Sequence, residues 1–90
     1  MRVALICTDK PGALEVRKAN RADHLAYIEA TGVVEMAGPL LNDAGEMAGS
    51  LVILEVETLE AARDWTKGDP YAKAGLFSDV RIQPWNKVIG

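Results

Sequence analysis

The chain has 90 residues, of which 49% are apolar and 26% charged, and its formal net charge is −3. This length and composition predict one globular domain over residues 1–90. Basic residues form no cluster or stripe, which argues against nucleic acid as a partner, and no apolar run is long enough to cross a membrane.

The first half of the chain predicts a strand, a long helix and a second strand. The apolar run VALICT predicts a strand at residues 3–8. Residues 11–31 are rich in helix-forming side chains, begin with a proline and end before Gly32, so they predict a helix. The stretch VVEMAGPLLND predicts a strand in which Gly38-Pro39 marks a bulge, a close backbone approach or an edge-strand irregularity.

The second half predicts a hairpin, a helix, a short helical turn and a last strand. NDAGEMAGS contains a turn and SLVILEVE predicts a strand, so the second and third strands form a hairpin. TLEAARDWTKG predicts a helix with Thr58 as N-cap and Gly68 as the C-cap glycine. DPYAKAG predicts a helical turn, and LFSDVRIQPWNKV predicts the fourth strand.

The order of these elements is β-α-β-β-α-β. In one domain of this length that order is typical of the split βαβ of ferredoxin-like α+β folds. We therefore expect a four-stranded antiparallel sheet with both helices on one face.

Both faces of the central strands are apolar. Side chains alternate between the faces of a strand. One face then carries Val3, Leu5 and Cys7, and the other carries Ala4, Ile6 and Thr8. Because two helices cover only one face, we expect a homodimer in which the uncovered sheets pack together. The alternative is that these strands carry extra Val and Leu through strand propensity alone.

The only histidine, His24, is the default candidate for a general acid or base. The apolar stripe of its helix is defined by Leu14, Leu25 and Ile28. On the wheel Arg21 falls near the middle of that stripe, and His24 and Arg17 lie on its edge. A buried arginine needs an anion or must extend to solvent, so Arg21 and His24 indicate a site for an anionic molecule. The alternatives are a core histidine bonded to a backbone carbonyl and a structural salt bridge at Arg21.

Asp69 precedes Pro70, a pattern typical of a helix N-cap. A cap and a site are compatible. One carboxylate oxygen can accept from a helix N–H while the other accepts from an imidazole N–H, which would fix the tautomer of His24. The local sequence alone favours a plain cap; the hypothesis that Asp69 divides these two tasks between its oxygens also requires that it lies beside His24.

Other residues have weaker signals. Tyr71 either presents its hydroxyl beside Asp69 or packs, and Ser50 has no base near it in the sequence and suits a turn. Trp85 is an anchor, more typical of a dimer interface than of a ligand wall. Cys7 lies inside a strand and is expected to be inert, and a single cysteine excludes an internal disulfide. No spacing of His, Cys and carboxylates indicates a metal, and no nucleotide-binding motif is present, so we expect no cofactor. The N-terminus lacks a secretion-signal cleavage pattern, which favours a cytoplasmic location.

The sequence resembles the YciI-like (YCII-related) family of the dimeric α+β barrel superfamily. The resemblance is carried, in order, by Arg21-x-x-His24-Leu25, Gly38-Pro39, Gly49-Ser50, Asp69-Pro70-Tyr71 and Pro84-Trp85. It covers nearly the whole chain and implies a ferredoxin-like monomer, a dimer formed through the sheets, and a pocket that holds a catalytic pair, His24 and Asp69. It also implies that Arg21, Ser50 and the Gly38-Pro39 backbone line that pocket.

The family includes a chloro-hydroxyhydroquinone dehydrochlorinase, and the superfamily includes muconolactone isomerase. The resemblance thus implies a cofactor-independent enzyme of lyase or isomerase type, acting on a small hydroxylated aromatic or lactone-type acid. In this hypothesis His24 moves a proton, Asp69 orients it, and Arg21 binds a carboxylate or a developing oxyanion. The alternative is a non-catalytic dimeric module that binds a small acid or accompanies a larger enzyme.

Overall fold

The computed structural model describes residues 1–90 as four strands and three helices. In chain order these are β1 (Arg2–Asp9), α1 (Leu14–Thr31), β2 (Val34–Leu41), β3 (Met47–Glu55), α2 (Leu59–Gly68), α3 (Pro70–Lys73) and β4 (Phe77–Trp85). The strands form one sheet in the order β2-β3-β1-β4, and every neighbouring pair is antiparallel. The predicted ferredoxin-like α+β fold is confirmed.

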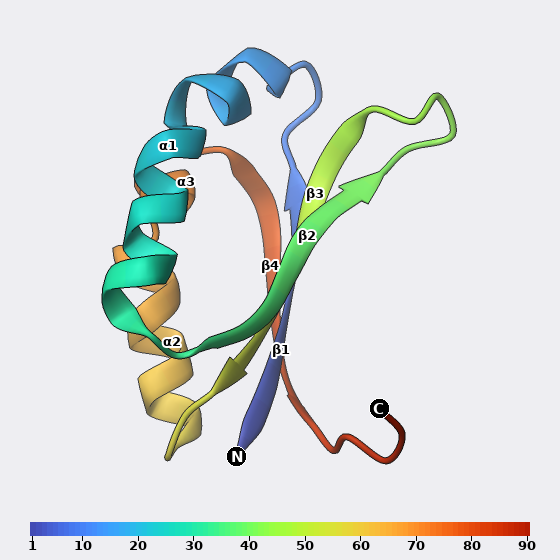
Figure 1. The fold of residues 1–90 in the computed structure, drawn as a ribbon. Helices are drawn as coiled ribbons and strands as arrows, with labels where there is room; N and C mark the ends of the chain where they lie inside the picture. Colours follow the sequence, from blue (N-terminus) through green and yellow to red (C-terminus); the bar gives the residue numbers. More distant parts are fainter.

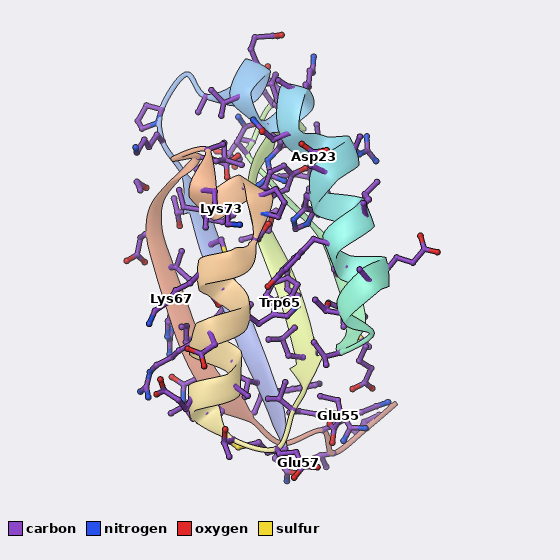
Figure 2. All side chains as sticks on the ribbon, turned by 90° about the vertical axis from the view of Figure 1, so that its left-hand side faces the viewer. Asp23, Glu55, Glu57, Trp65, Lys67 and Lys73 are labelled. Atoms are coloured by element: carbon purple, nitrogen blue, oxygen red, sulfur yellow. The ribbon has the colours of Figure 1, made fainter.

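All three helices lie on the same face of the sheet, and the other face carries no helix (Figure 1). The core fills the space between sheet and helices, and its fully buried strand residues are Val3, Leu5, Val52 and Leu54. Trp65 of α2 enters the space between α2 and α1 (Figure 2). Its indole Nε1 donates a hydrogen bond to Thr31 Oγ1 at 2.9 Å, so its one polar atom is satisfied inside the core. None of the helices has both the length and the apolar character that crossing a bilayer requires.

The helix-free face of the sheet, called here the open face, carries large exposed apolar side chains. Met36 is 50% exposed, Leu51 39% and Trp85 41%. The residues after β4 turn to this side of the sheet (Figure 1), where Lys87 Nζ pairs with Glu35 of β2 at 3.5 Å. The predicted alternation of apolar side chains between two faces therefore holds, and most of the second face is uncovered in the single chain.

The helix ends follow local signals with two differences. Thr58 caps α2 by accepting from the Ala61 backbone N–H, and Gly32 ends α1 in the left-handed conformation, as predicted. The long helix begins three residues later than predicted, because Gly12 has a φ of 72° and forms a turn. The prediction that Gly68 is a C-cap glycine is wrong: it is the last residue of α2 and has no positive φ. A Cβ there would lie too close to the Tyr27 hydroxyl, so any other residue would force the Tyr27 side chain to shift.

Candidate functional site

A cavity of about 150 Å³ lies between α1, α3 and the strands β2 and β3. Its polar wall consists of Arg17, Arg21, His24, Ser50 and Tyr71, and β2 contributes Ala37, Gly38 and Pro39. β2 is an edge strand, so Pro39 interrupts no central ladder. The register irregularities of β2 flank Gly38-Pro39 instead of falling on it. The structure thus brings six of the seven predicted site residues to one cavity, and the seventh, Asp69, lies behind His24.

His24 and Asp69 form a buried pair, in which the residues are 6% and 3% exposed. The His24 Nδ1 atom lies 2.7 Å from Asp69 Oδ1. A carboxylate accepts hydrogen bonds, so Nδ1 donates the proton of this bond, and in the neutral imidazole Nε2 is the nitrogen left with a free lone pair. Nε2 makes no hydrogen bond within the chain, and His24 lines the cavity. This is the arrangement that general base catalysis needs.

Asp69 caps α3 with the same oxygen that contacts His24. The Tyr71 backbone N–H donates to Asp69 Oδ1 at 3.0 Å, and Oδ1 also accepts from the imidazole. The expectation that the two oxygens divide these tasks is therefore wrong. Pro70 has no N–H, so the first free amide of α3 is that of Tyr71, and this amide shares Asp69 Oδ1 with the imidazole.

Arg17, and not Arg21, is the buried arginine of α1. Arg17 is 3% exposed, whereas Arg21 is solvent-exposed and contributes to the cavity wall. The predicted wheel was centred wrongly because Leu25, used to place the apolar stripe, is 51% exposed. The buried line of the helix runs through Arg17 and His24. Arg21 has no ion pair within the chain and is the unneutralised cation of the cavity wall.

Arg17 is held in a two-pronged ion pair by Asp9 at the end of β1. Its Nε donates to Asp9 Oδ2 at 2.7 Å and its Nη2 to Asp9 Oδ1 at 2.8 Å. Nη2 also donates to Ser50 Oγ at 2.9 Å. Burial alone would lower the pKa of Arg17, but the hydrogen bonds and charge of Asp9 outweigh burial and raise it. Arg17 therefore stays charged and fixed in place.

Tyr71 lies between the His24–Asp69 pair and the Arg17–Asp9 pair. Its ring stacks on His24 with centroids 3.9 Å apart and an interplanar angle of 16°, and Arg17 Cζ lies 4.8 Å from its centroid. Arg17 and His24 are two helical turns apart, about 10 Å along the axis, so the tyrosine ring fills the space between them. Burial raises the pKa of the Tyr71 phenol, although the charges of Arg17 and Arg21 act to lower it.

Sequence reasoning missed Asp9 as a site residue and left Arg17 at the edge. Two signals were available. Arg17 and His24 are seven positions apart, which places them on one line of a helix. Asp9 is a carboxylate directly after the mostly apolar predicted strand VALICT. No group of three or more His, Cys, Asp or Glu side chains that could hold a metal comes together.

The YCII-related domain model matches residues 1–86 of the chain. The protein YciI of Escherichia coli is 38% identical, over 98% of this chain and 99% of that protein. An uncharacterized protein of Haemophilus influenzae is 37% identical over the same shares of the two chains.

Solved structures show the same fold. The 5-chloro-2-hydroxyhydroquinone dehydrochlorinase TftG of Burkholderia phenoliruptrix, in complex with 2,5-dihydroxybenzoquinone, superposes with a TM-score of 0.86 at 35% identity, covering 96% of this chain and 94% of that chain. An antibiotic biosynthesis monooxygenase superposes with a TM-score of 0.62 at 10% identity over 98% of each chain, which shows a shared fold alone. With a family model over nearly all its length and relatives above one third identity, the chain belongs to the YCII-related family.

Proposed function

We propose that this protein is a small cofactor-independent enzyme that transfers a proton on a hydroxylated aromatic or lactone-type acid, in a dehydrohalogenation or an isomerisation. The observation that carries the proposal is the contact of 2.7 Å between His24 Nδ1 and Asp69 Oδ1. It leaves Nε2 as a free base on a cavity wall that also holds an unpaired cation, Arg21.

The chemistry requires one base and one anion site. In a dehydrohalogenation His24 Nε2 takes a proton, the electron pair left behind forms a new double bond, and the halide leaves with the electrons of its bond to carbon. In an isomerisation the same nitrogen takes a proton from one atom and returns it to another. Asp69 stabilises the imidazolium formed in either case, and Arg21 binds a carboxylate or the developing oxyanion.

One solved relative supports this class of reaction. TftG is a dehydrochlorinase of a hydroxyhydroquinone, and it shares the fold of this chain at 35% identity. Both the substrate of that enzyme and the quinone in its structure are small oxygenated rings. A cavity of about 150 Å³ that opens to solvent suits a ligand of that size.

We also propose that two copies of the chain pair through their open faces. Met36, Leu51 and Trp85 are each between 39% and 50% exposed on this face. Apolar patches of this kind are uncommon on monomers, and a second sheet would cover them without any new element.

A turnover screen tests the catalytic proposal. Purified protein is offered chlorinated hydroxyhydroquinones and unsaturated lactone acids, and halide release and ultraviolet spectra are followed. We expect turnover of at least one compound and a loss of about 100-fold or more in His24→Ala, because general base catalysis contributes that much. Asp23→Asn, an exposed change one position away on α1, is the matched control.

Two results would contradict the proposal. If His24→Ala keeps the wild-type rate, His24 is not the base. If a small acid binds in a manner that depends on Arg21 while no compound turns over, the protein is the non-catalytic binding module instead.

A further inference from the structure

Ser50 is a buried residue of the cavity wall, and its hydroxyl accepts a hydrogen bond from Arg17. The residue is 4% exposed, sits on the helix-covered side of β3 and lines the cavity. Its Oγ is 2.9 Å from Arg17 Nη2. A guanidinium has only donors, so Ser50 must be the acceptor of this bond.

The hydroxyl hydrogen of Ser50 is therefore free. Ser50 donates to no other group of the chain, although a serine hydroxyl can donate one bond and accept others. The free hydrogen can rotate about the Cβ–Oγ bond away from the positive guanidinium. Charge repulsion and the open space of the cavity both favour an orientation toward a bound ligand.

Asp9 holds the Arg17 guanidinium in the position from which it donates to Ser50. Its two oxygens hold Arg17 Nε and Nη2 at 2.7 and 2.8 Å, and the paired side chains are only 5% and 3% exposed. A guanidinium held at both prongs cannot turn away from Ser50. Asp9, Arg17 and Ser50 thus form a chain of hydrogen bonds that runs from the end of β1 into the cavity and ends in one available donor.

His24 offers the cavity a hydrogen-bond acceptor, whereas Ser50 offers a donor. Its Nε2 presents a lone pair to the same cavity, because Asp69 occupies Nδ1. The cavity therefore contains an acceptor on α1 and a donor on β3, with the cation of Arg21 beside them. A ligand that satisfies both must present a hydrogen-bond donor at one position and an acceptor oxygen at another.

We propose that Ser50 donates a hydrogen bond to the ligand oxygen that becomes negative when His24 removes a proton, and that Asp9 positions Ser50 through Arg17. This inference rests on the proposed function for the role of His24. It narrows the substrate class to compounds with a carbonyl or ionisable hydroxyl conjugated to the acidic position, such as hydroxyquinones and enolic lactones. A ring that presents only a hydrogen-bond donor to Ser50 would leave the Ser50 hydroxyl hydrogen unused.

Binding of 2,5-dihydroxybenzoquinone, measured by titration calorimetry, tests the inference without turnover. Its ionised oxygens are acceptors of the kind that Ser50 would recognise. We expect Ser50→Ala to weaken binding roughly tenfold or more, because a buried acceptor on the ligand loses its donor. Ser50→Thr keeps the hydroxyl and should stay near the wild-type affinity. Asp23→Asn, the exposed change on α1, is the control.

The role of Asp9 is tested by a double-mutant cycle. If Asp9 acts through Arg17 on Ser50, Asp9→Asn should weaken binding in the wild-type background and cause little further loss in the Ser50→Ala background. A purely structural role would weaken binding equally in both. If Asp9→Asn does not fold, Asp9→Glu and the Ser50 pair of variants still provide the comparison.

The failures are distinguishable. Equal affinity of wild type and Ser50→Ala, or no binding of the quinone to wild type, overturns the inference even if turnover is found. Binding that depends on the Ser50 hydroxyl in a protein without any turnover supports the donor role and overturns only the proposed catalysis.

Discussion

Cys7 of β1 shows at the residue scale how strongly the interior beneath the site disfavours charge. Its side chain faces the helices and is 3% exposed. Burial, with a smaller contribution from the negative charge of Asp69, raises the pKa of the Cys7 thiol from 9.0 to about 12. The thiol is neutral at physiological pH, so Cys7 does not supply a nucleophile to the cavity.

This pKa predicts a loss of stability in alkali. Both the folded and unfolded states keep the thiol proton below pH 9, and above it the unfolded state loses the proton first. The free energy of unfolding should therefore fall between pH 9 and 12, by up to about 1.4 kcal/mol per pH unit from this group. Urea unfolding of wild type and Cys7→Ala from pH 7 to 11 measures the difference, since the variant lacks the group. If the unfolding free energies of the two proteins change with pH in parallel, the pKa of Cys7 is not raised in the folded state.

A site residue was predictable from the sequence only where both its residue type and its position along the chain pointed to a functional role. His24 stands out because it is the single histidine, and Asp69 because it precedes a proline; their spatial meeting was an expectation from the resemblance. The helical wheel misplaced Arg17 because it treats every leucine as buried, and Leu25 is half-exposed at the cavity mouth. Asp9 and the single shared oxygen of Asp69 depend on side-chain rotamers, which periodicity does not determine.

At the scale of elements, β3 is packed so closely against β1 that one position excludes any side chain. A Cβ on Gly49 would collide with the backbone carbonyl oxygen of Cys7. The two strands are paired in register there, with Gly49 opposite Thr8. Relief would require the strands to separate, because a backbone carbonyl cannot move aside as a flexible side chain can.

Gly49→Ala should therefore destabilise the protein by about 1–3 kcal/mol, the usual cost of overpacking. Gly38→Ala on β2 is the control, because a Cβ there meets nothing within 4 Å and the residue has no positive φ. Urea unfolding midpoints of the two variants give the comparison. Equal midpoints would show that β1 and β3 can separate at little cost.

The order and type of the elements were predictable because apolar periodicity, prolines and glycines agree along the chain. Their ends were less so. β3 begins at Met47, three residues before the predicted strand, because the hairpin turn is closed by a side chain. Asn42 Oδ1 accepts from the backbone N–H groups of Ala44 and Glu46, both at 3.0 Å. Such local side-chain bonds compete with simple propensity and shift strand boundaries.

For the molecule as a whole, the open face is the largest feature that the single chain leaves unexplained. Leu51 lies near the middle of this face, opposite Gly38 on one side and Ile6 on the other. A charge introduced there would be buried in a sheet-to-sheet dimer and solvated in a monomer. The position therefore separates the two states.

We expect the wild-type protein to sediment as a dimer and Leu51→Lys to sediment as a monomer, because an unpaired buried charge costs several kcal/mol. Val16→Lys is the matched control, since Val16 is 37% exposed on α1, away from the open face. Sedimentation equilibrium at micromolar concentration measures the outcome. A monomeric wild type, or a dimer that persists in Leu51→Lys, would contradict pairing through the open faces.

The alternation of β2 has a consequence for how such a protein would respond to its surroundings. Ala37 and Pro39 of this edge strand line the cavity, while Met36 and Leu40 point to the open face. One strand therefore forms a wall of both the ligand site and the surface available to a second copy. If pairing changes ligand affinity by some factor, ligand must change the pairing constant by the same factor, because the coupling of two binding equilibria is reciprocal. A higher protein concentration would then change the affinity for ligand, and added ligand would change the fraction of paired protein, with β2 as the strand common to both surfaces.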